Sequence, residues 1–365
     1  MINLDFMPSR QLALYAAKLF LTRSLAVLIA LVLVLMTLDL LGESSKILKV
    51  PGNGEAELWR YVSLRLPLLI SRFLPFSVLL GALIAFAGLN QHSEVVSMKA
   101  AGLSAHQILA PMIAASVGVA VALFIFNETV VIQSARTVTA WSDADYEPIP
   151  PESDILSNVW VRDGDALVRA KLVGGRGAST QLRGVTIYER EGGALARVVD
   201  AQRAEQVPGG WRLQDVRTYD APMNIVTRRK EAIALSGVEP QRFTLARVDP
   251  TERDFVALRE AIGDLEAAGR PSEEARTGWW HKISGPLSTI LMPLLAATAA
   301  FGLARSGKVL LRATIGMALG FAYFVADNFS LALGNIGAYP PFLAAWAPFF
   351  LFLLIGELVL IRQEE

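Results

Sequence analysis

The sequence predicts an α-helical membrane protein with six transmembrane helices in a 3+3 arrangement and an inserted all-β, jelly-roll-like domain. Of the 365 residues, 53% are hydrophobic and the mean hydropathy is +0.41, which exceeds the usual apolar share of a soluble domain. Six segments are apolar over a length that can cross a hydrocarbon core, which takes about 20 residues. A long polar stretch separates two groups of three. The predicted divisions are therefore 1–134, 135–275 and 276–365.

The expected membrane spans are defined by apolar runs. The first three cover about 19–41, 64–89 and 108–131, and the last three cover about 283–303, 310–333 and 341–361. Pro67 and Pro75 lie inside the second run. Because proline removes a backbone donor and clashes with the preceding turn, we expect this second helix to be bent or offset.

Lysine and arginine near the span ends orient the chain, because cytoplasmic loops carry an excess of both. Basic residues precede the first span, fill the loop between the fourth and fifth spans and follow the sixth: Arg10, Lys18, Arg23, Arg305, Lys308, Arg312 and Arg362. The loop at 334–339 has none. Both termini are therefore expected in the cytoplasm and the β domain on the outer side. Four cations on the predicted outer side disagree with this rule: Lys46, Lys49, Arg60 and Arg65.

The polar insert has the pattern of short strands joined by tight turns. The segment "NVWVRDGDALVRAKLV" alternates around Asp163-Gly164, a hairpin-type turn, and "PGG" at 208–210 marks another. Such spacing is typical of a sandwich or jelly roll. From Thr251 the period becomes helical, and Thr251 with Asp254 resembles a capping box, so a terminal helix is expected over about 251–268.

Several kinds of chemistry are excluded by residues that the sequence lacks. There is no cysteine, the three histidines are far apart, and no phosphate-binding loop or zinc-protease motif occurs, so we expect no catalytic site, no metal site and no cofactor in this chain. Lysine and arginine number 34, as do aspartate and glutamate, which gives no reason to expect nucleic acid as a partner. Any energy source must therefore be another protein.

The segment "SEVVSMKAAGLSAHQILAP" at 93–111 is too polar to span a bilayer and predicts a short helix, about 91–106, on the cytoplasmic side. Gly102 suits the position just past a helix end, and Ser104 suits the cap of the next helix. Two interpretations remain open: an interfacial helix lying on the inner leaflet, or a coupling helix that docks into a groove on a soluble ATPase.

Charged residues in or near the spans are the next candidates, because burying one in lipid is costly. Arg72 either pairs with Asp39 or extends outward, or it joins Lys46, Lys49, Arg60 and Arg65 in a basic rim that binds an anionic lipid head group, with Arg136 nearby. For Asp327 an interhelical hydrogen bond is favoured over a proton relay. Gly316 and Gly320 form a small-xxx-small pair that permits close helix contact.

The motifs taken together resemble a known family. "SEVVSMKAAGLS", "NVWVRDGDALV", "GVTIYERE", "WRLQDV" and "WWHKISGPLSTILMPLLAATAAFGLARSGKVLLRATIGMALGF" occur in the order and spacing found in the LptF/LptG permeases of the lipopolysaccharide exporter, and more closely in its LptG branch. The resemblance covers essentially the whole chain.

The resemblance implies a bacterial inner-membrane protein with a periplasmic β domain. It implies five kinds of partner: an LptB-type ATPase dimer that binds ATP and Mg²⁺, an LptF-type permease, an LptC-type membrane-anchored jelly-roll protein, an LptA-type periplasmic bridge, and lipopolysaccharide itself. It implies that Glu94 is the coupling glutamate and that Met98, Gly102 and Ser104 lie in the same ATPase-coupling element. The first span lacks the lysine that contacts lipid phosphate in some members, so the head-group candidates are Lys46, Lys49, Arg65, Arg72 and Arg136.

Two other classes of protein remain as alternatives. An ion-driven secondary transporter of an anionic lipid would use Asp327 and broken helices, although the fifth span has no proline. A membrane-anchored structural or sensor protein would bind partners through its β domain and would need no coupling helix. Co-purification of an ATPase distinguishes the exporter from both.

Overall fold

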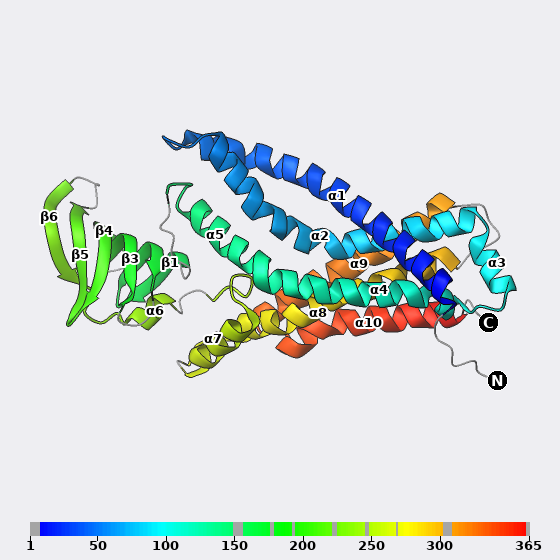
Figure 1. Ribbon diagram of the computed structural model, residues 1–365. Coiled ribbons are helices and arrows are strands. Elements are labelled where there is room, and N and C mark those ends of the chain that lie inside the picture. The colour runs from blue at the N-terminus through cyan, green and yellow to red at the C-terminus, as the bar shows by residue number, and fades with distance from the viewer. Residues whose placement is uncertain are drawn as a thin grey trace. The chain divides into compact units, whose positions relative to one another are not determined.

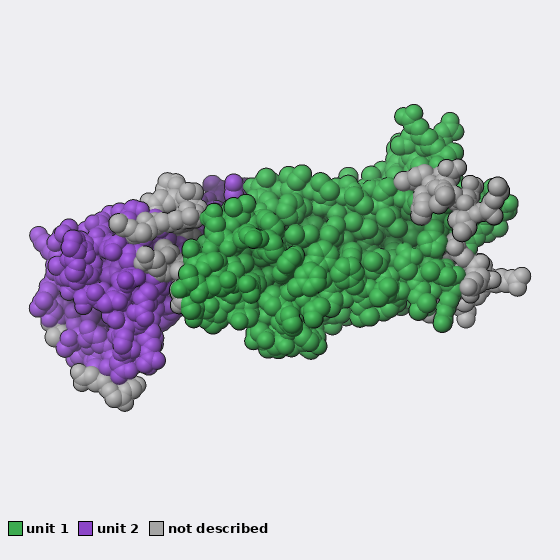
Figure 2. Space-filling view, turned by 90° about the horizontal axis from the view of Figure 1, so that it is seen from below, with its two compact units in different colours: residues 1–40, 65–132, 253–365 green, residues 41–64, 133–252 purple. Residues whose placement is uncertain are grey.

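The computed structural model describes residues 8–148, 156–175, 179–191, 194–220, 225–244, 248–267, 269–301 and 309–362. The basic loop residues Arg305 and Lys308 lie outside these ranges. The chain forms two compact units, coloured separately in Figure 2: unit 1 holds 1–40, 65–132 and 253–365, and unit 2 holds 41–64 and 133–252. Each unit has its own hydrophobic core.

Six helices in the described residues are long and apolar enough to cross a membrane, which confirms the 3+3 prediction. They are α1 (Arg10–Lys49), α2 (Glu55–Gln91), α4 (Ala105–Phe126) with its continuation, α8 (Glu273–Phe301), α9 (Val309–Asn335) and α10 (Pro341–Arg362) (Figure 1). The continuation of α4 is a π-helix, η1 (Asn127–Val131), followed by α5 (Ile132–Asp143). Pro67 and Pro75 lie within α2.

Glycines allow close helix contact in unit 1. A Cβ atom at Gly320 of α9 would lie 2.0 Å from Leu79 Cδ2 of α2, and one at Gly316 would lie 2.5 Å from Leu83 Cδ2. The small-xxx-small prediction is therefore confirmed, and the contact is between α9 and α2.

Two of the spanning helices are largely uncovered, since only 17% of the most apolar stretch of α1 and of α9 is buried. These two helices thus keep broad apolar faces uncovered by the chain.

The insert is an antiparallel sheet of six strands in unit 2, which confirms the all-β prediction. The strands are β1 (Leu156–Asp163), β2 (Ala166–Gly174), β3 (Gln181–Glu191), β4 (Ala194–Val207), β5 (Gly210–Asp220) and β6 (Ile225–Ala234), and their order in the sheet follows the chain. Asp163 pairs with Ala166 across the predicted turn, where Gly164 has a φ of 58°. Because sheet order equals chain order and each described pair is antiparallel, the described strands form a meander without a crossover.

One short helix, α6 (Pro240–Thr244), closes the core of the sheet. The Trp211 ring of β5 meets the Phe243 ring edge-on at 5.2 Å, and Trp211 Nε1 donates a 2.8 Å hydrogen bond to the Val238 carbonyl. Trp211 and Phe243 are both fully buried.

The helix expected at 251–268 is α7 (Phe255–Ala267). Its cap is Asp254, whose Oδ1 accepts a 2.8 Å hydrogen bond from the Ala257 N–H. The predicted pairing of Thr251 with Asp254 is wrong, because the Thr251 hydroxyl bonds to Asp249 instead. This helix belongs to unit 1, where it packs on α8 through an apolar face that includes Leu258 and Leu265, rather than to the unit that holds the sheet.

Candidate functional site

The first candidate site is the turn between α2 and α4, which holds the short helix α3 (Glu94–Ala100). Gly102 follows the end of α3 with a φ of +89°, a conformation that strains any residue with a Cβ. Its N–H donates to the Lys99 carbonyl at 3.0 Å, and the Leu103 N–H donates to the Met98 carbonyl at 3.1 Å. This is a Schellman motif, and the predicted position of Gly102 is confirmed.

The next helix begins at a capping box, as predicted for Ser104. Ser104 Oγ accepts from the Gln107 N–H at 3.1 Å, and Gln107 Oε1 accepts from the Ser104 N–H at 3.0 Å. Two orphan backbone donors are thereby satisfied. Four residues, 101–104, join the end of α3 to the start of α4, and the Schellman motif and the capping box fix this short turn.

Side chains of α3 divide between the core and the surface. Val95 is buried and Met98 is half-buried, and both pack in the hydrophobic core of unit 1. Val96, Ser97 and Lys99 are exposed. The helix is thus held against the membrane unit along one side and open on the other.

Glu94, the candidate coupling residue, is bonded to the first helix. Tyr15 of α1 donates its hydroxyl to Glu94 Oε1 at 3.1 Å. Sequence reasoning missed Tyr15, because the two residues are 79 positions apart and a tyrosine near a span end is normally taken as an interfacial anchor. The contact joins α3 to α1.

A second contact at this end of unit 1 joins α4 to α10. His106 Nε2 lies 3.1 Å from Glu357 Oε2, and both side chains are about one-third exposed (35% and 39%). His92 instead contacts its own helix, with Nδ1 at 2.9 Å from the Gly88 carbonyl oxygen. The α3 region is therefore connected to α1 and to α10 by polar side chains.

The candidate head-group residues have separate local partners. In unit 1, Arg65 donates two hydrogen bonds of 3.0 and 3.2 Å to Asp39, so of the alternatives for Arg72 the pairing with Asp39 is wrong. In the antiparallel α1–α2 pair, Arg65 lies beside Asp39. Arg72 lies about two helical turns further along α2 and therefore does not reach this carboxylate. Arg72 is exposed and makes no hydrogen bond or ion pair with any residue in the described ranges.

In unit 2, Lys46 forms an exposed ion pair with Glu43 at 2.8 Å, and Lys49 is exposed. Arg136 donates a hydrogen bond from Nε to the Glu252 carbonyl. The Arg60 guanidinium lies over the Trp141 ring at 4.9 Å.

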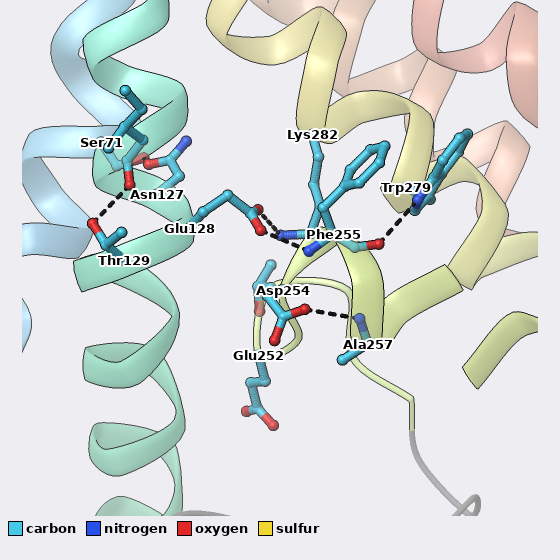
Figure 3. A network of polar contacts seen from close by, with 12 residues as sticks. Ser71, Asn127, Glu128, Thr129, Glu252, Asp254, Phe255, Ala257, Trp279 and Lys282 are labelled. Atoms are coloured by element: carbon cyan, nitrogen blue, oxygen red, sulfur yellow. Dashed lines mark hydrogen bonds and ion pairs between the residues drawn. The ribbon is translucent and has the colours of Figure 1, made fainter. Parts of the chain in front are cut away.

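The second candidate site is a polar junction at the π-helix, shown in Figure 3. Glu128 of η1 accepts from Lys282 Nζ of α8 at 2.8 Å and from the Phe255 N–H at the start of α7 at 2.6 Å. The Lys282 and Glu128 side chains are only 12% and 17% exposed. The neighbouring Asn127 accepts from Ser71 of α2 at 2.6 Å. Four elements of unit 1 therefore meet at one turn.

Sequence reasoning missed this junction, although charged residues in or near the spans gave a signal. π-Helical turns occur often at functional sites, because the extra residue changes which side chains face a neighbour. The favoured hydrogen bond of Asp327 is not formed with any residue of the described ranges, and Asp327 is half-buried on α9. No group of three or more metal-ligating side chains occurs in the described part of the chain.

Six helices that can span a membrane and an inserted antiparallel β-sheet define the class of multi-pass membrane proteins with an inserted β domain. The family model described as lipopolysaccharide export system permease LptF/LptG matches residues 14–362, and the chain belongs to this family.

Two relatives named lipopolysaccharide export system permease protein LptG show the extent of the similarity. The Escherichia coli K12 protein is 27% identical over 350 residues, which cover 91% of this chain and 95% of the relative. The Haemophilus influenzae protein is 25% identical over 324 residues, which cover 86% and 89%.

Proposed function

We propose that this chain is the permease subunit of an ABC transporter that extracts lipopolysaccharide from the bacterial inner membrane and passes it to a periplasmic bridge toward the outer membrane. Its membership of the LptF/LptG family and its six spans support this function. Hydrolysis of ATP belongs to a partner, an LptB-type ATPase dimer that binds ATP and Mg²⁺, and this chain is not an enzyme. Both termini face the cytoplasm and the β domain faces the periplasm.

The single observation that carries the mechanism is the bonding of α3. Val95 and Met98 seat it on the core, Gly102 and Ser104 fix its exit, and Glu94 connects it to Tyr15 of α1. An ATPase that binds the exposed side of α3 therefore moves α1 and α4 together when its own conformation changes. The coupling element is formed by Glu94, Met98, Gly102 and Ser104, with Tyr15 as a positioning residue.

The uncovered apolar faces of α1 and α9 support a lateral path for the lipid. Because α1 and α9 keep broad apolar faces, an LptF-type permease can close a cavity against them, and lipopolysaccharide enters it from the outer leaflet of the inner membrane. The β domain meets LptC-type and LptA-type partners. The phosphates of the lipid bind cations drawn from Lys46, Lys49, Arg65, Arg72 and Arg136. Arg72 is the first of these, because Arg65 is already held by Asp39.

Transport in proteoliposomes tests this function. The full chain is reconstituted with the ATPase and the partner permease, and release of lipopolysaccharide to a periplasmic acceptor is measured with and without ATP. We expect ATP-dependent release with the native chain. With Glu94→Lys the permeases still insert, but release is lost or the ATPase dissociates. Normal export by an assembled Glu94→Lys complex contradicts the coupling role, and release driven by an ion gradient without nucleotide contradicts the exporter class.

A further inference from the structure

A cleft of about 550 Å³ in unit 1 lies apart from the coupling element and adjoins the polar junction, because Trp279 of its lining donates Nε1 to the Phe255 carbonyl at 3.1 Å. It is formed by α7, the first turns of α8 and the start of α10. The residues of its lining that carry the argument are Arg259, Glu266, Arg276, Trp279, Trp280 and Phe342. Its volume is in the range of small-molecule sites, about 300–1,000 Å³.

Aromatic side chains form one part of the cleft. The Trp279 ring stacks on Phe255 with 4.6 Å between centroids, and the Trp280 ring meets Phe342 edge-on at 5.1 Å. Phe342 is 45% exposed. Tryptophan is enriched at the level of the lipid head groups because its ring is apolar and its N–H is polar. The cleft therefore lies where α8 and α10 enter the bilayer.

Charged side chains form the other part. The Arg259 guanidinium lies over the Trp279 ring at 5.4 Å, and Arg276 Nε lies 2.8 Å from Glu266 Oε1. Two arginines and one glutamate leave the lining with an excess of one positive charge. Arg259 has no carboxylate partner within the described ranges, so its N–H groups can still bind an anion. An arginine fork matches the oxygens of a phosphate.

We propose that this cleft binds the head group of an acidic glycerophospholipid from the surrounding bilayer. The phosphate lies against Arg259 and Arg276, and the glycerol and the first acyl carbons lie against Trp280 and Phe342. The level of the cleft is the level of lipid phosphates, and its excess charge matches a phosphodiester with one negative charge. A helix of about 10 Å diameter, such as a partner protein would offer, does not fit a cleft of this size.

Lipid binding to the purified full-length chain tests the proposal, without ATPase or transport, so its outcome is independent of the proposed function. Native mass spectrometry compares phosphatidylglycerol with phosphatidylcholine, and quenching of tryptophan fluorescence by brominated acyl chains reports where each lipid lies. We expect phosphatidylglycerol to bind more tightly. Arg259→Gln should weaken that preference by about threefold to tenfold, the effect of losing one hydrogen-bonded contact of ordinary strength at an exposed site.

Two variants make the comparison sharp. Arg259→Gln leaves the Arg276–Glu266 pair in place, so α7 stays attached and the melting temperature should not change. Arg162→Gln removes one positive charge from an exposed arginine of β1 and serves as the matched control. If both variants weaken phosphatidylglycerol equally, the attraction is general and no site exists.

Two further outcomes overturn the proposal. Displacement of phosphatidylglycerol by a lower concentration of lipopolysaccharide would identify the transported lipid as the occupant. Loss of the bromine quenching that depends on Trp280, measured as the difference between the native chain and Trp280→Phe, once partner subunits are added would show that a protein covers the cleft.

Discussion

Lys282 Nζ lies 2.8 Å from Glu128 Oε1, and both side chains are largely removed from solvent. The same carboxylate accepts the Phe255 N–H, so one glutamate on the π-helix connects α8 to the start of α7. Removing one member of a buried ion pair leaves a charge without its partner, which costs more than removing both.

Lys282→Met should therefore destabilise unit 1 by about 3–5 kcal/mol. Glu128→Gln combined with Lys282→Met should lose less, because no charge remains buried. The melting temperatures of the two purified variants in detergent, compared with that of the native chain, rank their losses of stability. A double variant less stable than Lys282→Met alone contradicts this account of the junction.

Gly102→Val should strain the turn after α3, since the native φ of +89° is unfavourable for a β-branched residue. The substitution should raise the free energy of the folded state by about 1–3 kcal/mol and should change the geometry of α3 locally. We expect the protein to insert normally while ATP-driven lipid release falls. The control is Gly118→Ala within α4, where an added Cβ meets no atom within 4 Å. Equal transport by the two variants contradicts the importance of the turn.

Tyr15→Phe removes the hydroxyl that Glu94 accepts and leaves the ring in place. Since such a hydrogen bond contributes about 0.5–1.5 kcal/mol, stability should change little. The expected change is in coupling: the ATPase remains bound, and fewer lipid molecules are released per ATP hydrolysed. Tyr339→Phe, at an exposed tyrosine of the α9–α10 loop, is the control. An unchanged ratio of release to hydrolysis would show that the contact is structural only.

Gly320→Val should separate α9 from α2, because even a Cβ there lies 2.0 Å from Leu79 Cδ2. Overpacking of this kind costs about 1–3 kcal/mol. Leu79→Ala should partly restore the melting temperature of Gly320→Val by making room. If Leu79→Ala does not raise the melting temperature of Gly320→Val, the valine clashes with a residue other than Leu79.

Much of the fold could be predicted because it depends on local patterns. Apolar runs place all six spans, alternation around Asp163-Gly164 places the first hairpin, and glycine and serine place the turn at 102–104. Each of these signals acts within a few residues. The edge strands of the described sheet, β1 and β6, follow only from the three-dimensional order.

The polar contacts of the candidate sites could not be predicted, because they join distant positions. Tyr15 and Glu94 are 79 residues apart, and Glu128 and Lys282 are 154 apart. Pairing with Arg72 was one of the alternatives for Asp39, yet the register of α1 against α2 places Arg65 beside it. A π-turn depends on the tertiary partners of the extra residue and has no sequence pattern of its own.

The uncovered surface of α9 has a consequence for the cellular abundance of this protein. Asn328 is exposed there beside half-buried Asp327, among exposed apolar residues such as Phe324 and Phe329. An exposed amide among acyl chains is costly, and the cost falls when another subunit covers it. If the proposed LptF-type permease covers this face, a chain made in excess of that permease should be short-lived, and the supply of the permease should set its abundance.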